Sequence, residues 1–115
     1  MGGGPRELLE AEREAARKRL AALEREFDTV VESASRANTD DEHDPEGSTI
    51  AFERQHVAAL AAAARQRIAG IDAALARVAA DSYGRCERCG RPIARGRLAA
   101  RPAATTCVSC AERPR

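Results

Sequence analysis

Apolar and small residues recur in the first third of the chain at alternating steps of four and three positions. From residue 16 onward they are Ala16, Leu20, Leu23, Phe27, Val30, Ala34 and Ala37. Steps of this kind place successive side chains on one stripe of a helix, as in the seam of a coiled coil. The positions between them are rich in Arg and Glu, which favour helices. The pattern predicts a long first helix with a single apolar stripe.

A second stripe with the same spacing follows further along the chain. Its members are Ile50, Val57, Ala61, Ala64, Ile68, Ile71, Leu75 and Val78. Each predicted helix has about 30 residues and a length of about 45 Å, at 1.5 Å per residue. Gly70 lies inside the second helix, where a glycine costs about 1 kcal/mol relative to alanine. The spacing still predicts a second long helix.

The polar segment ANTDDEHDPEGST, residues 37–49, separates the two stripes. Within it, Asp44 suits the N-cap of a helix, Pro45 the first helical position and Glu46 the positive end of the helix dipole. A short connection between two long helices predicts an antiparallel hairpin. We therefore expect a coiled-coil hairpin over residues 6–82, with its bend at residues 38–47.

The composition limits how much this hairpin can bury. Alanine accounts for 26 of the 115 residues, whereas Leu, Ile, Val and Phe together make up only about 16%. Alanine allows close approach of two helices but buries little area, so the hairpin should be only marginally stable alone. The sequence contains neither an apolar run of membrane-spanning length nor a signal-peptide core. We expect a cytoplasmic protein without a membrane partner.

All four cysteines lie near the end of the chain, in the pattern Cys-x2-Cys-x17-Cys-x2-Cys. This spacing is typical of a tetrahedral zinc site with four thiolate ligands. Disulfides are disfavoured in a reducing cytosol, and a redox dithiol of the thioredoxin type needs a strand–helix context that is missing here. We predict one structural Zn²⁺ bound by Cys86, Cys89, Cys107 and Cys110. The ion would hold together a finger over residues 83–112, with residues 1–5 and 113–115 as flexible tails.

Charge is distributed unevenly along the chain, although the formal net charge is only +1. Residues 40–46 carry five acidic residues and no arginine or lysine. Residues 83–115 carry eight arginines and two glutamates. The sequence thus predicts an acidic bend and a basic zinc module.

The segment YGRCERCGRPIARGRLAARPAATTCVSC resembles the zinc-finger signature of the DksA/TraR family. The matching positions are Tyr83, Gly84, Cys86, Cys89, Gly90, Ile93, Arg97, Leu98, Ala100, Pro102, Cys107 and Cys110. The predicted coiled-coil hairpin with an acidic bend resembles the hairpin of this family as well, so the resemblance extends over nearly the whole chain. The predicted fold class is all-α, a long antiparallel coiled-coil hairpin with a small C-terminal four-cysteine zinc finger. The first helix begins close to residue 1, which indicates a short form.

The resemblance implies a bacterial transcription regulator that binds RNA polymerase directly. In the family the hairpin enters the secondary channel of the polymerase, the acidic tip approaches the catalytic centre, and some members act with guanosine tetraphosphate. The family's tip pattern, Asp-x-x-Asp-x-Ala, is matched by Asp41 and Asp44, whereas Glu46 stands in place of the alanine. Arg97 and Arg101 are the arginines that the motif places best for contacting the polymerase or a phosphate-bearing ligand.

Two other functions remain open from the residues alone. The arginines around the zinc site are compatible with a zinc-ribbon nucleic-acid-binding protein, although aromatic residues are scarce. The hairpin is also compatible with a structural adaptor, in which the acidic residues serve solubility and Asp44 only caps a helix. We expect neither sequence-specific DNA binding nor an enzyme, because a closed four-thiolate site leaves no open position for a substrate. A monomer is expected.

Overall fold

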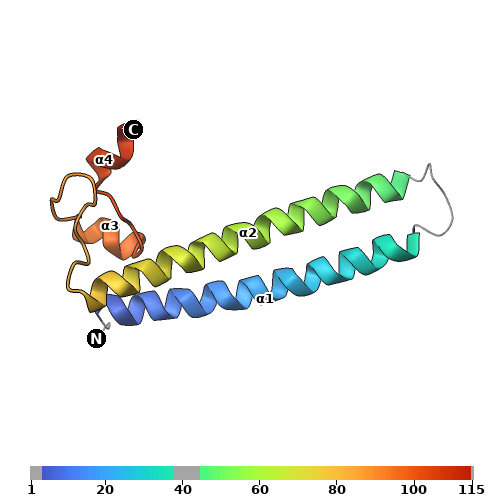
Figure 1. Ribbon diagram of the computed structural model, residues 1–115, viewed down its shortest axis with the longest axis horizontal. Helices are drawn as coiled ribbons and strands as arrows, with labels where there is room; N and C mark the ends of the chain where they lie inside the picture. Colours follow the sequence, from blue (N-terminus) through green and yellow to red (C-terminus); the bar gives the residue numbers. More distant parts are fainter. Residues whose placement is uncertain (1–3, 38–44, 115) are drawn as a thin grey trace. The chain divides into compact units, whose positions relative to one another are not determined.

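The computed structural model describes residues 4–37 and 45–114. The regular elements in this part of the chain are α-helices, and it contains no β-strand (Figure 1). Two long helices, α1 (Pro5–Ala37) and α2 (Pro45–Ala79), precede two short ones, α3 (Arg95–Ala100) and α4 (Val108–Glu112). A single isolated antiparallel bridge pairs Arg85 with Pro92. The predicted all-α fold class, with two long helices and a four-cysteine module, is confirmed.

Prolines begin both long helices. Pro5 is the first residue of α1 rather than part of the predicted tail, and Pro45 is the first residue of α2. Proline suits this position because the missing N–H would have no partner in the helix and its φ is already helical. Gly70 does not interrupt α2. The predicted N-cap, Asp44, lies outside the described residues.

The chain divides into two compact units, one of residues 15–67 and one of residues 1–14 and 68–115. Within each unit the portions of α1 and α2 run antiparallel (Figure 1). The predicted division into a hairpin over 6–82 and a finger over 83–112 stays a prediction, because the second unit joins the finger to adjoining parts of both long helices.

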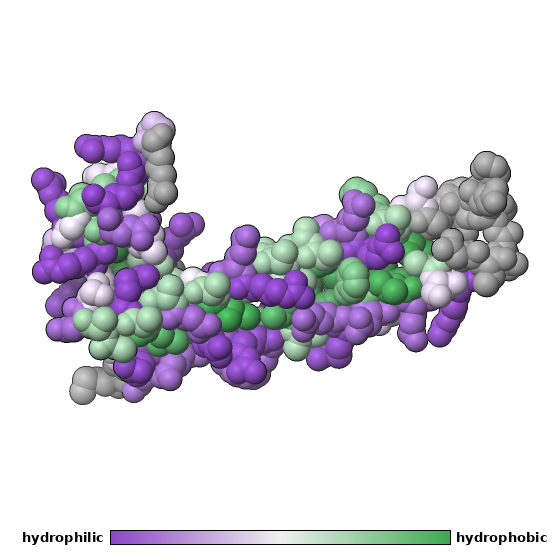
Figure 2. Space-filling model, in the orientation of Figure 1, coloured by the Kyte–Doolittle hydropathy of each residue, from purple (hydrophilic) through white to green (hydrophobic). Residues whose placement is uncertain are grey.

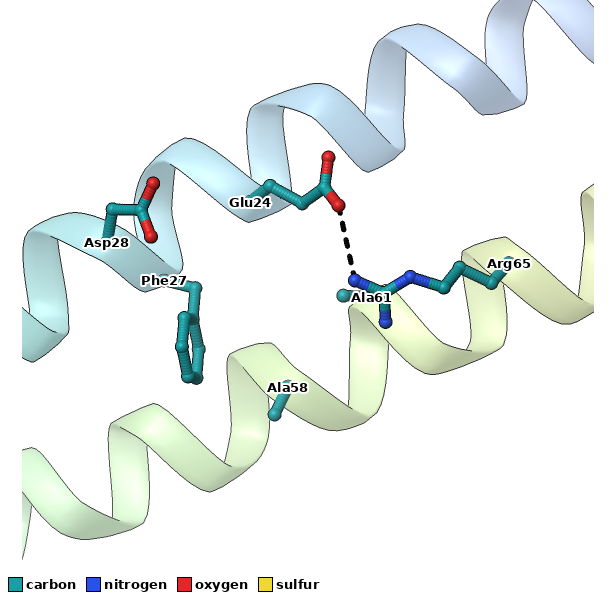
Figure 3. Close-up of a pocket in the computed structure, with 6 residues that line it drawn as sticks. All are labelled: Glu24, Phe27, Asp28, Ala58, Ala61 and Arg65. Atoms are coloured by element: carbon teal, nitrogen blue, oxygen red, sulfur yellow. Dashed lines mark hydrogen bonds and ion pairs between the residues drawn. The ribbon is translucent and has the colours of Figure 1, made fainter.

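The unit of residues 15–67 has a narrow core. Leu23, Val57, Ala61 and Ala64 are buried, and the partly buried Leu20, Phe27 and Leu60 pack against them. Figure 3 shows Phe27 of α1 beside Ala58 of α2, with Glu24 and Arg65 in an ion pair of 3.2 Å. This ion pair is exposed and adds at most about 1 kcal/mol. Packing across the alanine-rich seam is therefore the main attraction between these helix portions.

In the other unit, residues of the first turns of α1 pack against the last turns of α2. Leu9, Ile71 and Ala74 are almost fully buried there. Nearby, Arg13 Nε donates to Asp72 Oδ1 at 2.6 Å. The carboxylate of Asp72 raises the pKa of Arg13, chiefly through this hydrogen bond. The ion pair is largely exposed, so burial of Leu9, Ile71 and Ala74 is the main attraction between α1 and α2 in this unit.

The predicted seam positions and the buried positions agree along most of the hairpin, with one difference. Ala16, Leu23, Val30, Val57, Ala61, Ala64 and Ile71 are buried as the stripes predict. In the last turns of α2, however, Ala74 is buried although it is not a seam position, whereas Leu75 and Val78 are half-buried. The covered face is thus broader there than a strict heptad predicts. The side chain of Ala37 lies outside the described residues.

The helix α2 ends in a left-handed turn. Asp81 has φ of +61°, and the N–H of Ser82 donates to the Arg77 carbonyl at 2.9 Å. A residue in this conformation closes a helix by pairing its last carbonyls. Asp is among the few residues other than glycine that adopt it with little cost. The turn ends α2 and leads into the first cysteine pair.

Much of the surface is charged, with apolar surface in places along the long helices (Figure 2). Phe52, on α2, is the most exposed large apolar side chain described, at 75%. Among the described residues, no helix has an apolar stretch long enough to cross a membrane.

Candidate metal centre

The first cysteine pair lies in a tight turn closed by backbone hydrogen bonds. The N–H of Gly90 donates to the Cys86 carbonyl at 2.9 Å, and the N–H of Cys86 donates to the Arg91 carbonyl at 2.9 Å. Gly90 has φ of +75°, a conformation that costs a glycine nothing. The segment CERCG therefore forms a turn in which the thiols of Cys86 and Cys89 can bind the same metal ion.

Glycine is also needed just before this turn. Gly84 has φ of +86°, and a Cβ at this position would come within 3.4 Å of Leu98 Cδ1. The Gly84 carbonyl accepts a hydrogen bond of 2.7 Å from the N–H of Ile93. This close approach brings the chain on both sides of the first pair together.

The second cysteine pair lies at the start of a short helix. Cys107 is the N-cap residue of α4, and its carbonyl accepts a 2.9 Å hydrogen bond from the N–H of Ala111. Cys110 lies within α4 and is buried. One helical turn thus places the two thiols on the same side.

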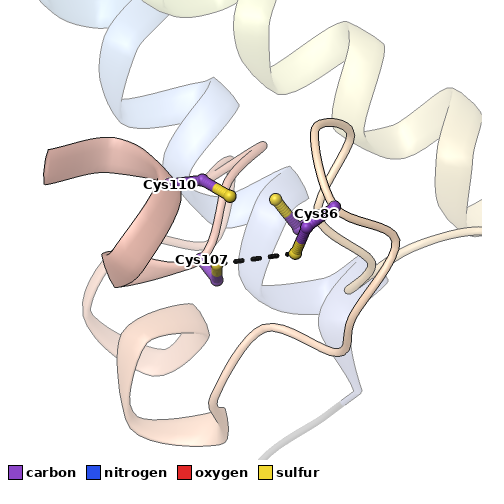
Figure 4. A group of neighbouring side chains, drawn as sticks. Cys86, Cys107 and Cys110 are labelled. Atoms are coloured by element: carbon purple, nitrogen blue, oxygen red, sulfur yellow. Dashed lines mark hydrogen bonds between the residues drawn. The ribbon is translucent and has the colours of Figure 1, made fainter. Parts of the chain in front are cut away.

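The four sulfur atoms of Cys86, Cys89, Cys107 and Cys110 all lie within 4.8 Å of one another. Cys89 Sγ and Cys107 Sγ are 3.8 Å apart. A tetrahedral zinc ion with Zn–S bonds of about 2.3 Å has sulfur–sulfur edges of about 3.8 Å. Figure 4 shows the thiols of Cys86, Cys107 and Cys110 directed toward one another. All four cysteines are free of disulfides, so the donor set fits one structural zinc ion.

The thiols differ in acidity. Burial raises the pKa of Cys86, but hydrogen bonds from the backbone of Cys107, Cys89 and Arg88 outweigh it and lower this pKa to about 6. Burial, together with the neighbouring thiols, raises the pKa of Cys110 to about 12. These hydrogen bonds favour the thiolate of Cys86, the form in which cysteine binds zinc. Zinc binding must displace the proton of Cys110.

Apart from the thiols, the module buries very little. Its core consists of Cys86, Ile93 and Cys110, with Leu98 and Cys107 packed against it. Two aliphatic side chains are too few to hold a segment of this length. Metal binding has to supply the remaining folding free energy, as it does in other small zinc modules.

Tyr83 ties the entry of the module to its middle. Its hydroxyl donates to the carbonyl of the buried Pro102 at 2.7 Å, and burial raises its pKa. We expect Tyr83→Phe to lower the free energy of unfolding by about 1 kcal/mol, because it leaves a buried carbonyl without its donor. Chemical denaturation of the zinc-loaded proteins measures this difference. A variant as stable as the wild type would show that water replaces the hydroxyl at no cost.

Arg97 and Arg101, the two arginines predicted to contact the polymerase or a phosphate-bearing ligand, have different surroundings in the structure. Arg97 Nε donates to the Thr106 carbonyl at 2.8 Å, so this side chain also holds the module together. Among the described residues, no hydrogen-bond partner is found for the Arg101 guanidinium. Both arginines line a pocket of about 450 Å³ that also includes Arg88 and Arg113. The pocket is basic and belongs entirely to the unit that contains the finger.

The acidic residues of the bend cannot be placed in the same way. Asp41 and Asp44 lie outside the described residues, and so does the side chain of Glu46, although its backbone belongs to the first turn of α2. Their assignment remains a prediction from the sequence.

Known proteins share both parts of this architecture. Residues 81–114 match the model of the prokaryotic dksA/traR C4-type zinc finger. The RNA polymerase-binding transcription factor DksA of Caulobacter vibrioides, in strains NA1000 / CB15N and ATCC 19089 / CIP 103742 / CB 15, is 37% identical to this chain over 98 residues. The finger of this chain is thus a C4-type zinc finger of the dksA/traR kind, and the chain as a whole is similar to DksA.

The alignment with the DksA sequences covers 85% of this chain and 61% of each relative, so the chain spans about 61% of the length of the curated relatives that it matches. Transcription factor DksA2 from Pseudomonas aeruginosa has a similar solved structure, with a TM-score of 0.77 and 27% sequence identity. That match covers 94% of this chain and 78% of the other. The similarity to DksA proteins thus extends over the helices of the hairpin as well as the finger.

Several positions of the DksA/TraR signature have a physical role here. Tyr83, Gly84 and Gly90 shape the approach to the first cysteine pair, and Arg97 braces the approach to the second. Sequence reasoning missed Arg88, which lies between Cys86 and Cys89 and hydrogen-bonds to the Cys110 carbonyl at 2.6 Å. Its position next to two ligands was the signal that could have suggested a structural role.

Proposed function

We propose that the protein regulates bacterial transcription by binding RNA polymerase directly. The observation that carries this proposal is the structural match to transcription factor DksA2, which covers 94% of this chain. The curated relatives, named as RNA polymerase-binding transcription factors, support the same function. The protein acts as a regulator rather than an enzyme, since four thiolates leave its metal without an open position.

In this proposal the hairpin enters the secondary channel of the polymerase and carries the acidic residues Asp41, Asp44 and Glu46 toward the catalytic centre. A two-helix hairpin is narrow enough for a deep channel, because each helix is only about 10–12 Å across. Carboxylates that reach such a site interact with cations, either a bound metal or basic side chains. Five acidic residues between 40 and 46 give the bend this capacity.

The basic pocket of the finger would contact an acidic rim of the polymerase or a phosphate-bearing ligand such as guanosine tetraphosphate. Arg101 is the better candidate of the two predicted contacts, because the guanidinium of Arg97 already donates to Thr106. A planar guanidinium can make two parallel hydrogen bonds to a phosphate or carboxylate. The protein works in the cytoplasm as a monomer and does not read a DNA sequence.

Equilibrium binding to core RNA polymerase without DNA tests the proposal. The zinc-loaded protein is expected to bind with micromolar or tighter affinity, and Arg101→Met should weaken binding by about 10-fold, the equivalent of one lost charge-assisted contact. Arg91→Met is the matched control, because Arg91 is an exposed arginine of the same module. Absence of polymerase binding together with salt-dependent binding to DNA would favour the nucleic-acid-binding alternative.

A further inference from the structure

The second cysteine pair is hydrogen-bonded on both sides by arginines from elsewhere in the finger. At the C-terminal end of the pair, Arg88 NH1 donates to the Cys110 carbonyl at 2.6 Å and to the Arg113 carbonyl at 3.2 Å. At the N-terminal end of the pair, Arg97 Nε donates to the carbonyl of Thr106, the residue before Cys107, at 2.8 Å. We call Arg88 and Arg97 the arginine clamp.

Each member of the clamp links two segments that are distant in the sequence. Arg88 lies between the first two cysteines, so its guanidinium connects the first pair to the end of α4. Arg97 lies in α3 and connects that helix to Thr106, the residue before the N-cap residue of α4. A backbone hydrogen bond of 2.9 Å from the Glu87 N–H to the Thr105 carbonyl also joins the turn of the first pair to the segment that precedes the second.

Arg88 adds a side-chain donor at the end of a short helix, where the Cys110 carbonyl otherwise accepts only a 3.2 Å backbone hydrogen bond from the N–H of Arg113. The helix α4 has only five residues, so its final carbonyls have few partners within the helix. The guanidinium of Arg88 gives the Cys110 carbonyl a second donor, pairs the carbonyl of the C-cap residue Arg113, and faces the negative end of the helix dipole. The last turn, which carries Cys110, is thereby fixed in the helical conformation.

The positive charges of the clamp also complement the negative charge of a zinc ion bound by four thiolates. Zinc with four thiolates has a formal charge of −2, and positive groups nearby reduce its electrostatic cost. None of the clamp's hydrogen bonds uses a sulfur atom, so every sulfur remains available to the metal. Groups that orient ligands in this way commonly change metal affinity when they are removed.

We propose that Arg88 and Arg97 are positioning residues that hold Cys107 and Cys110 in place for zinc and slow the release of the ion. Opening of the site begins at the second pair, because α4 is short and loses its anchors when the clamp is removed. The first pair keeps its own turn, which the backbone bonds from Gly90 and Cys86 close.

The test compares the zinc-loaded full chain with Arg88→Met and, as control, Arg91→Met. Methionine replaces the unbranched stem of arginine but has no guanidinium and cannot donate a hydrogen bond. Arg91 lies in the same loop and is exposed, and no side-chain hydrogen bond is found for it within the described residues. In excess chelator, R88M should release zinc about 10–100 times faster than wild type, whereas R91M should stay within about twofold. Equal release rates for R88M and R91M would overturn the proposal.

A second readout identifies which pair opens first. Each zinc-loaded protein is exposed to iodoacetamide in a short pulse, and the alkylated cysteines are located by mass spectrometry. In R88M and in Arg97→Met, Cys107 and Cys110 should be modified well before Cys86 and Cys89. General destabilisation would modify all four cysteines together, and that result would also overturn the proposal.

A conservative pair covers the case in which R88M fails to take up one full equivalent of zinc. Arg88→Lys keeps a donor that can reach one carbonyl, so its release rate should fall between those of wild type and R88M. Arg91→Lys is its control. A lysine variant that releases zinc as slowly as R91K would show that charge alone suffices, which contradicts a role for the two hydrogen bonds.

Discussion

Replacement of Cys107 by serine is expected to abolish tight zinc binding and to unfold the finger. Structural zinc sites contribute an apparent binding free energy of about 10–16 kcal/mol at neutral pH. The finger has no other source of comparable size, because its core contains only Ile93 and Leu98 besides the cysteines. Leu9 and Ile71, buried in the same compact unit, should become less protected as well.

Metal content and thermal unfolding measure this effect. C107S should contain less than one equivalent of zinc, and its unfolding midpoint should fall by about 10 °C or more, since 1 kcal/mol corresponds to about 4–8 °C in a small domain. Hydrogen exchange should accelerate most between residues 81 and 114. Ser109→Ala is the matched control, because Ser109 is an exposed residue between the same two ligands. Wild-type thermal stability in a metal-free C107S protein would show that zinc does not hold the finger.

The double variant Asp41→Asn with Asp44→Asn is expected to bind polymerase about as well as wild type but to lose its effect on transcription. The substitution removes two negative charges while the side chains keep their size. In a cleft with a lower dielectric constant than water, such charges interact strongly with cations. Asparagine is as good an N-cap as aspartate, so the start of α2 at Pro45 should be preserved.

In vitro transcription from a promoter that responds to the wild-type protein measures the effect, with polymerase binding measured in parallel. We expect regulation to fall by about tenfold, and binding to change by less than about twofold, or 0.4 kcal/mol. The control variant, Glu32→Gln with Glu53→Gln, makes the same charge change at exposed positions of α1 and α2. Full regulation by the double variant would rule out a role for the two carboxylates. Loss of helix content in circular dichroism would instead attribute the change in regulation to a disturbed start of α2.

The heptad spacing was enough to predict α1 and α2, because burial on one stripe leaves a clear period in the sequence. Leu23 and Val57 are buried for this reason. The cysteine spacing was enough for the zinc site, since a tetrahedral ion demands four ligands that local turns can bring together. The helix boundaries were less certain, but Pro45 marked the start of α2 correctly.

The interior of the finger was harder to predict, because its short elements depend on contacts between distant residues. The six residues of α3 have no periodic signal, and the helix is braced by the bond from Arg97 to Thr106. The same holds for Arg88, whose partners lie 22 and 25 positions away. The position of Arg88 between two ligands is the one local signal, and it does not say which distant carbonyls the side chain reaches.

The narrow core of residues 15–67 has a consequence for how this protein can evolve and be engineered. Among the side chains described there, a few, such as Leu23, Val57 and Ala61, are constrained by packing, while most face water. Exchanges among exposed, helix-favouring residues usually change stability by less than about 0.5 kcal/mol. The hairpin can therefore acquire new surface charges, and with them new affinities, while its fold persists. Selection for a different partner would find many neutral mutational paths on the hairpin and few in the finger, where most residues near the cysteines are already committed to structure.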